Sequence, residues 1–313
     1  MQYSAGTIEF TLDRLSVVTL GKFDGMHRGH QKLLNRVLEI SQERDFLSVL
    51  FTFDVSPAAI LKNGGAGMLL TNEERRDILS RSRLDWLVEC PFEKSLMHME
   101  AEDFVRDILV EKLRAAVLVV GPDFRFGYQR KGTPELLKQM GTKCGFSVEV
   151  LDKETYKDRE ISSTRIREAV LRGQMEEAAQ MLGFPYFLSG KIIHGRQLGR
   201  KLGIPTTNLR ADGRRLLPPF GVYITRNLIG DRDFGGITNI GTKPTVNGEF
   251  VGVETHLFSC NLNLYGENER VELLKFLRKE KRFDSVEQLK GQILADEEEG
   301  RQYISGYGAG LNI

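Results

Sequence analysis

The chain has 313 residues, of which 44 are basic and 43 acidic, so its formal net charge is +1. This length favours two domains, and the balanced charge excludes the basic excess typical of nucleic-acid-binding proteins; we expect small-molecule partners and no nucleic acid. Cys90, Cys144 and Cys260 lack paired spacing, and no segment has the length and apolarity of a signal sequence or membrane span. A cytoplasmic protein with reduced thiols and no membrane partner is therefore expected.

The first predicted strand, residues 16–20, runs into Gly21-Lys22-Phe23-Asp24-Gly25-Met26-His27-Arg28-Gly29-His30, and helical apolar spacing follows. A strand, a glycine-rich turn and a helix start bring unpaired backbone N–H groups to one point, where a polyphosphate can bind. His27 and His30 can donate hydrogen bonds to oxygens whose charge grows as pyrophosphate leaves, and Gly29 permits close approach of the backbone. The pattern indicates nucleotidyl transfer.

Two other interpretations of the histidines are open. They are either a surface feature of a loop or ligands of a metal ion. A closed zinc site is disfavoured because no cysteine or third histidine lies nearby in the sequence.

Strands and helices alternate through the rest of the first half. Strands are predicted at 46–53, 86–89, 116–120 and 146–151, and helices from a capping box at 71–74 toward Leu79, at 101–114 and at 134–143. This alternation predicts a doubly wound, Rossmann-like α/β sheet. Ligands of such sheets bind at the carboxyl ends of the strands, so the loops after Leu20, Phe53 and Val120 should converge on one site.

The loop after Val120 reads Gly-Pro-Asp-Phe-Arg-Phe-Gly and holds an acid beside aromatic rings. Asp123 with Phe124 suits a planar heteroaromatic ligand that presents N–H groups at its edge. The alternative is that Phe124 and Phe126 simply pack in the core, as large apolar side chains usually do.

The segment Ile-Ser-Ser-Thr-Arg-Ile-Arg at 161–167 opens a helix that stops at Gly173. Ser163, Thr164 and Arg167 can hold phosphates through hydroxyl donors and a forked cation. A plain helix cap with solvated arginines is the alternative.

After helices that are predicted to end near Leu182, breakers at 183–186 mark a linker, and the second half has a different pattern. Short alternating runs at 187–193, 221–226, 236–240, 253–259 and 270–276 predict a small antiparallel β-barrel. A helix from Ser285 to about Ile304 ends the domain. Its apolar face is expected to contain Val286, Leu289, Ile293 and Leu294 and to pack across the barrel.

The strongest motif of the second half is Gly-Arg-Gln-Leu-Gly-Arg-Lys-Leu-Gly-Ile-Pro-Thr-Thr-Asn at 195–208. Its glycines and cations indicate a phosphate loop. In an extended segment Thr206 and Asn208 share a face, where a hydroxyl and an amide oxygen can bind one hard cation such as Mg²⁺. A Pro-Thr turn with local side-chain bonds is the alternative.

The segment 253–258 alternates as a strand, so Glu254 and His256 share one face. On the inner face Glu254 would be a candidate base for an alcohol nucleophile. On the wet face both would be ordinary surface residues, and the pattern does not choose between the two faces.

The motifs at 21–30, 121–127 and 161–167 resemble the adenylyltransferase half of the prokaryotic bifunctional riboflavin kinase/FAD synthetase family. The second half resembles its riboflavin kinase domain in six successive segments, at 195–208, 217–223, 239–246, 253–256, 264–266 and 276–285. The resemblance implies an FMN adenylyltransferase domain at 1–182 and a riboflavin kinase domain at 183–313. ATP, riboflavin and FMN would be substrates, FAD the product and Mg²⁺ the metal, in a monomer or weak homo-oligomer.

The resemblance also implies roles for individual residues. Glu254 would activate the ribityl hydroxyl, His27 and His30 would hold the ATP phosphates, and Thr206 and Asn208 would bind Mg²⁺. Asp123, Phe124 and Phe53 would line the flavin site. Phosphate contacts are expected from Gly21, Lys22, Asp24, Gly29, Ser163, Thr164 and Arg167 in the first domain and from Gly195, Arg196, Gly199, Lys201 and Gly203 in the second.

The sequence departs from the family pattern at four places. The usual Phe-Asp-Pro-His-Pro is Phe-Asp-Val-Ser-Pro at 53–57, Thr207 replaces Ala, Asn263 replaces an acid, and Lys22 stands where Asn is frequent. The changed loop opens a first alternative, a kinase with a weak or silent adenylyltransferase. The second alternative is a flavin-binding regulatory protein.

Overall fold

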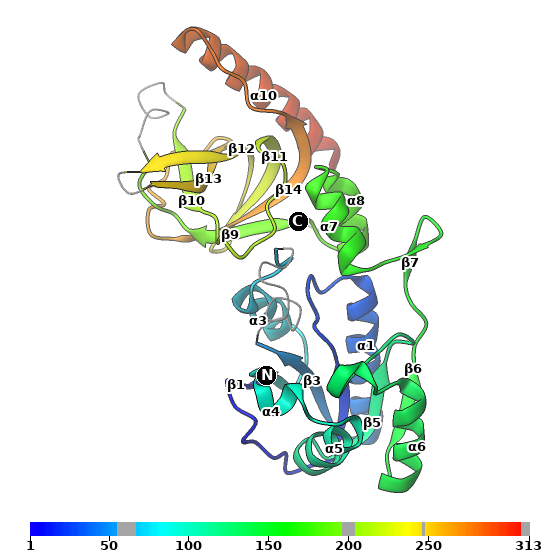
Figure 1. Ribbon diagram of the computed structural model, residues 1–313. Coiled ribbons are helices and arrows are strands. Elements are labelled where there is room, and N and C mark those ends of the chain that lie inside the picture. Colours follow the sequence, from blue (N-terminus) through cyan, green and yellow to red (C-terminus); the bar gives the residue numbers. More distant parts are fainter. Residues whose placement is uncertain (55–66, 196–203, 246–247, 308–313) are drawn as a thin grey trace. The chain divides into compact units, whose positions relative to one another are not determined.

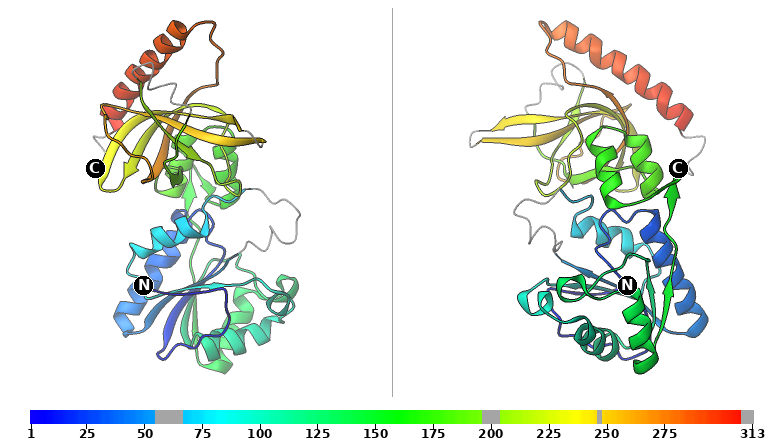
Figure 2. Two further views of the ribbon diagram at one scale, coloured as in Figure 1. Left: turned by 90° about the vertical axis from the view of Figure 1, so that its left-hand side faces the viewer. Right: turned by 45° about the vertical axis from the view of Figure 1, so that its right-hand side comes forward.

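The computed structural model describes residues 1–54, 67–195, 204–245 and 248–307. The chain separates into two compact units, Met1–Ser163 and Thr164–Ile313 (Figures 1 and 2). The sequence-based boundary at 182/183 lies further along the chain and stays a prediction.

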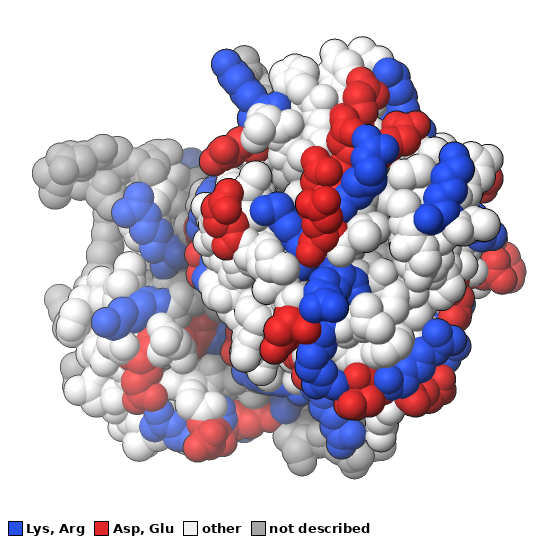
Figure 3. Space-filling model, turned by 90° about the horizontal axis from the view of Figure 1, so that it is seen from below, with Lys and Arg blue, Asp and Glu red and all other residues white. Residues whose placement is uncertain are grey.

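Basic and acidic side chains alternate on the face drawn in Figure 3, as the balanced composition suggests. Across the described residues, we find no helix with the length and apolarity required to cross a lipid bilayer.

The first unit is built on a parallel six-stranded sheet. Its strands are β1 (Gln2–Ala5), β2 (Ser16–Leu20), β3 (Leu47–Phe53), β4 (Trp86–Cys90), β5 (Ala115–Val120) and β6 (Ser147–Val150), in the order β1-β4-β3-β2-β5-β6. The chain therefore runs from β2 to one side of the sheet and then returns to the other, which confirms the doubly wound prediction. The switch point lies between β2 and β5, below the histidine turn and the Asp123 loop.

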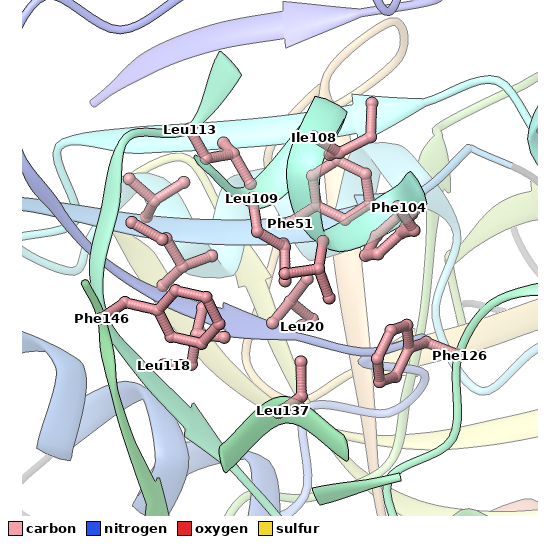
Figure 4. Close-up of a cluster of buried hydrophobic side chains, with 14 of the residues drawn as sticks. Leu20, Phe51, Phe104, Ile108, Leu109, Leu113, Leu118, Phe126, Leu137 and Phe146 are labelled. Carbon is pink, nitrogen blue, oxygen red and sulfur yellow. The ribbon is translucent and has the colours of Figure 1, made fainter. Parts of the chain in front are cut away.

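Helices cover both faces of this sheet. Outside residues 55–66, they are α1 (Arg28–Arg44), α3 (Asn72–Ser80), α4 (Lys94–Met97), α5 (Ala101–Asp103), the π-helix η1 (Phe104–Lys112), the 3₁₀ turn η2 (Tyr128–Arg130) and α6 (Pro134–Cys144). Val17 of β2 packs with Val37 and Ile40 of α1, whereas its neighbour Val18 belongs to the cluster that includes η1 and α6. Figure 4 shows this larger cluster, in which side chains of η1, α6 and the sheet meet.

Two local predictions have different outcomes. The capping box of α3 is confirmed, because Thr71 Oγ1 accepts from Glu74 N at 3.1 Å and Glu74 Oε2 accepts from Thr71 N at 2.8 Å. The single α-helix expected at 101–114 is instead a short α-helix followed by nine residues of π-helix. A π-helix bonds five residues apart, so the apolar period used for an α-helix describes it poorly.

The second unit holds the barrel, in the order β10-β13-β12-β11-β14-β9. Its strands are β9 (Phe187–Lys191), β10 (Thr206–Arg210), β11 (Gly221–Ile229), β12 (Arg232–Thr245), β13 (Gly248–Leu257) and β14 (Asn268–Arg278). All the pairs are antiparallel, and Ile193 N donates to Asn208 O at 2.8 Å where the two ends of the sheet meet. The barrel prediction is confirmed.

Three helices of the described residues accompany the barrel. Helix α7 (Ser163–Leu171) leads through Gly173 into α8 (Met175–Leu182), and α8 lies against β14 (Figure 1). A short antiparallel hairpin, β7 (Thr155–Tyr156) and β8 (Arg159–Glu160), precedes them at the end of the first unit. Sequence patterns predicted both helices but not the two-residue strands.

The last helix, α10 (Val286–Tyr307), packs on the barrel through a stripe that matches the expected one in part. Leu289 and Ile293 face the barrel as expected, whereas Val286 and Leu294 are exposed, which is a correction. Beyond Ile293 the contact stripe continues through Asp296 and Gly300 to Ile304. Asp296 is buried in an ion pair with Arg278 at 2.6 Å, and a side chain at Gly300 would collide with Ile237 and Phe258. A polar residue and a glycine at core positions hid this stripe from an apolar pattern.

Candidate active sites

The turn that follows β2 is strained and buried. Phe23 and Met26 have φ values of 47° and 42°, in the left-handed region, and both are almost fully buried. A non-glycine residue in this region costs free energy that the surrounding packing must offset, and such residues gather at functional sites. Gly25, with φ 89°, lies between them. The packing thus holds the backbone of this turn in one unusual shape at the start of α1.

His27 and His30 stack at this turn. Their ring centroids are 3.6 Å apart with an interplanar angle of 17°, and His27 caps α1 by accepting from His30 N at Nδ1, 3.4 Å away. Burial lowers the pKa of His27 to about 4, and burial together with the neighbouring His27 and Arg75 lowers the pKa of His30 well below its usual value. Both imidazoles are therefore neutral at pH 7. Because Nδ1 of His27 is an acceptor, its proton resides on Nε2, which can donate to a ligand.

Gly29 and Asp24 position this pair. A Cβ at Gly29 would lie 3.3 Å from Cε1 and Nδ1 of His27, so a larger residue would push the imidazole by a few tenths of an ångström. Asp24 Oδ1 accepts from the backbone N–H of Leu69 at 2.9 Å and of Leu70 at 3.3 Å, which ties the turn to the segment before α3. The phosphate contacts expected from Gly21, Lys22, Asp24 and Gly29 stay predictions.

The start of α7 reaches the same turn. Ser163 Oγ donates to the carbonyl oxygen of Asp24 at 2.9 Å, so residues 139 positions apart in the sequence meet there. Thr164 and Arg167 follow on the same helix but belong to the second compact unit. Of the three predicted phosphate ligands, the structure therefore brings Ser163 to the histidine turn, and the roles of all three stay predictions.

The predicted flavin-side residues lie at the carboxyl ends of β3 and β5. Phe53 ends β3 and packs edge-on against Phe92, while Phe124 stacks on Phe126 with centroids 5.6 Å apart. Phe53 and Phe124 stay partly exposed, whereas Phe126 is buried in the core. Asp123 is exposed and pairs with Lys153 at 2.9 Å. Residues 55–57 of the altered loop lie outside the described residues.

The second site is a cavity of about 290 Å³ between the barrel wall and α10. Its walls include Thr206 of β10, Asn239 and Lys243 of β12, and Glu254 and His256 of β13, while Leu289, Ile293 and Asp296 line it from α10. The cavity contains both polar groups and apolar walls, as small-molecule sites usually do. Thr206, Glu254 and His256 therefore share the face of the barrel that meets the cavity and α10. Thr255 between the last two is fully buried in the barrel, so the inner-face interpretation of Glu254 is wrong: this carboxylate lies on the outer face, in the cavity that α10 covers.

Glu254 is held from two sides. Its Oε1 accepts from the Thr206 hydroxyl at 3.0 Å, and its Oε2 pairs with Lys243 Nζ at 2.6 Å. The Glu254 side chain is 30% exposed. Sequence analysis did not assign Lys243 a role, although the alternation of β12 places it on the same face as Asn239, the register partner of Glu254.

Asn208 lies next to Thr206 and donates to its hydroxyl through Nδ2 at 3.4 Å. A Cβ at Gly195 would meet the Asn208 amide at 2.7 Å, so Gly195 makes room for this side chain. Arg196, Gly199, Lys201 and Gly203 lie outside the described residues. The nearby oxygens of a hydroxyl, an amide and a carboxylate form the donor set that a hard cation such as Mg²⁺ prefers, so the residues fit the expected metal.

His256, next on the Glu254 face, has its own partners. Its Nδ1 lies 3.0 Å from the carbonyl oxygen of Pro205, and its Nε2 lies 3.4 Å from Glu297 of α10. The Nδ1 contact fixes the segment that leads into Thr206. His256 therefore has a positional role beside the candidate base.

A parallel α/β sheet with a histidine-lined turn and a barrel with an acid beside threonine and asparagine define a two-unit, nucleotide-using transferase. Comparison with known proteins specifies the class further. The FAD synthetase family model matches residues 10–165, and the riboflavin kinase model matches residues 182–304. The chain belongs to the bifunctional riboflavin kinase/FMN adenylyltransferase family.

Two curated relatives carry that name along nearly their whole length. The protein of Buchnera aphidicola subsp. Schizaphis graminum is 38% identical over 93% of this chain and 94% of its own. The protein of Escherichia coli K12 is 36% identical over 92% of each chain. A solved structure from Streptococcus pneumoniae, titled a macrolide-efflux protein, is 32% identical and superposes with a TM-score of 0.86 over 96% of this chain and 98% of its own.

Proposed function

We propose that the protein phosphorylates riboflavin to FMN in the barrel unit and adenylylates FMN to FAD in the α/β unit, with ATP as the donor in both steps. The observation that carries the proposal is the contact between Thr206 and Glu254 on the wall of the cavity. It places a candidate base and a candidate metal ligand within one hydrogen bond of each other, as phosphoryl transfer to an alcohol requires.

In the barrel, the 5′-hydroxyl of riboflavin attacks the γ-phosphorus of ATP. A new oxygen–phosphorus bond forms, the bond to the β-phosphate oxygen breaks, and Glu254 takes the hydroxyl proton as ADP leaves. Lys243 orients the carboxylate through Oε2 and leaves Oε1 on the Thr206 side. Thr206 and Asn208 would hold Mg²⁺, which neutralises phosphate charge when it is bound.

In the α/β unit, a phosphate oxygen of FMN attacks the α-phosphorus of a second ATP and pyrophosphate leaves. The nucleophile is already ionised, so no protein nucleophile is needed. The role of the protein is to place neutral donors where negative charge develops, and Nε2 of His27 is such a donor. The backbone N–H groups at the start of α1 add to it.

The proposal also covers the cellular location, the oligomeric state and the divalent ion of the enzyme. We expect a cytoplasmic monomer or weak homo-oligomer that acts on small molecules, with Mg²⁺ as the divalent ion. Its balanced charge and widely spaced cysteines support this view. Gel filtration with light scattering would measure the oligomeric state.

One assay tests the function. The purified full chain is incubated with riboflavin, ATP and Mg²⁺, and the flavins are separated by chromatography. Formation of FAD is expected. FMN as the sole product would instead mean a kinase with a silent adenylyltransferase, and unchanged but tightly bound riboflavin would mean a regulatory flavin-binding protein.

A further inference from the structure

Arg75 of α3 lies under the carboxyl edge of the parallel sheet, in a position that no motif indicates. Its side chain is 5% exposed and donates to two main-chain carbonyls, Lys22 O at 3.3 Å and Phe53 O at 3.4 Å. These carbonyls belong to the segments where β2 and β3 end. One guanidinium therefore joins the histidine turn to the end of the strand that holds Phe53.

The same guanidinium is held on its other side. It forms an ion pair with Glu89 of β4 and donates to Asn72 Oδ1 at 3.1 Å. Glu89 is 1% exposed and also accepts from the Tyr3 hydroxyl at 2.7 Å. A planar fork with five donors can serve several acceptors at once, which a lysine ammonium on its flexible stem cannot do in the same geometry. The ends of β2, β3 and β4 thus meet at one buried cation.

The Arg75 charge also acts on one ring of the histidine pair. Three influences lower the pKa of His30: burial first, then the imidazole of His27, then the Arg75 cation. Phe23 contacts the His30 ring with centroids 4.9 Å apart and carries no charge. A buried cation opposes protonation of the His30 imidazole, whereas burial alone lowers the pKa of His27.

We propose that Arg75 is a positioning residue for adenylyl transfer, which ties the ends of β2 and β3 together. This proposal rests on the function assigned above to the α/β unit. With the two strand ends joined, the histidine turn and Phe53 keep a constant separation, and a shift of about 1 Å in such a site can cost a hundredfold in rate.

Two variants separate geometry from charge. Arg75→Lys keeps the cation but loses the fork, and Arg75→Gln loses the cation. We expect kcat/KM for conversion of FMN to FAD to fall at least about tenfold in both. In Arg75→Gln alone, NMR titration should show the pKa of His30 raised, because the nearby cation is gone.

The matched control is Arg76→Gln. Arg76 is the next residue of α3 and pairs with the same carboxylate, Glu89 Oε2, at 3.1 Å, but it is partly exposed and its ion pairs are with the side chains of Glu89 and Glu73. This variant should keep kcat/KM for FAD formation within about twofold of the parent value, and the pKa values of the two histidines should stay unchanged. Riboflavin phosphorylation serves as the internal control in every variant.

Retained FAD formation in folded Arg75→Lys and Arg75→Gln would overturn the proposal. Should Arg75→Gln fail to fold, the pair Arg75→Gln/Glu89→Gln replaces it, because removal of both charges costs less than removal of one. If the parent chain makes no FAD, the adenylyltransferase assignment fails instead, and that outcome is distinct from a loss of FAD formation confined to the Arg75 variants.

Discussion

The Thr206 hydroxyl donates a hydrogen bond of 3.0 Å to Glu254 Oε1 across the β10–β13 pair. The two residues are diagonal neighbours, since Thr206 stands opposite His256 and Asn208 opposite Glu254. Residues 48 positions apart in the sequence thus form one functional group. Two consequences can be tested separately, one for each residue.

Glu254→Gln should abolish most riboflavin phosphorylation. The amide keeps the shape of the side chain and its contact with Thr206 but cannot accept a proton, so we expect a loss of about 10²- to 10⁴-fold in kcat. FMN conversion to FAD should survive, because that site lies in the other compact unit. Glu298→Gln, on the exposed face of α10, is the control. Unchanged FMN formation in Glu254→Gln would remove the base from the mechanism.

Thr206→Val should raise the Mg²⁺ concentration needed for half-maximal kinase activity and lower kcat. Valine matches threonine in shape but lacks the oxygen that a hard cation binds. Thr207→Val is the matched control, since Thr207 is 7% exposed and is not among the cavity-lining residues. Kinase activity measured against a Mg²⁺ series compares the two. Equal effects of both substitutions would argue against a metal role for Thr206.

Gly29→Ala should lower FAD formation while it leaves or raises stability. The new methyl would press on the His27 ring from 3.3 Å, whereas alanine in a helix is favoured over glycine by about 1 kcal/mol. Gly291→Ala on α10 meets nothing within 4 Å and should change only stability. Urea unfolding and the FMN adenylylation rate report the two effects. A Gly29→Ala enzyme with full FAD synthesis would mean that the His27 position is not critical.

Stability should decrease as the pH falls. The pKa of His27 is lowered from 6.5 to about 4, so below pH 6.5 the unfolded chain takes up a proton that the folded chain resists. The loss begins near pH 6.5, is complete near pH 4 and amounts to roughly 3 kcal/mol for this residue. His30 acts in the same direction.

Urea unfolding at about pH 7 and about pH 5 measures this effect, and His27→Gln should make the difference between the two smaller. NMR titration of the same histidine provides an independent value. A His27 signal that titrates near 6.5 in the folded protein would contradict the predicted linkage.

Local patterns predicted most elements because their signals are short in range. The apolar run at 46–53, the capping box at 71–74 and the glycine stop at 173 each act within a few residues. These local signals were insufficient where contacts with distant segments decide which side of a helix is buried. Asp296 and Gly300 occupy contact positions of α10 because Arg278, Ile237 and Phe258 receive them there.

The sequence by itself determined the two-part architecture, the histidine turn and the Thr206–Asn208 pair, because glycine-rich turns, alternation and helix caps are written in neighbouring residues. Only the tertiary structure decided which face of β13 meets the cavity, that Lys243 holds Glu254, and that Arg75 joins the ends of β2 and β3. Strand register and burial arise from contacts between distant segments, and a linear pattern contains no information on which segments will meet.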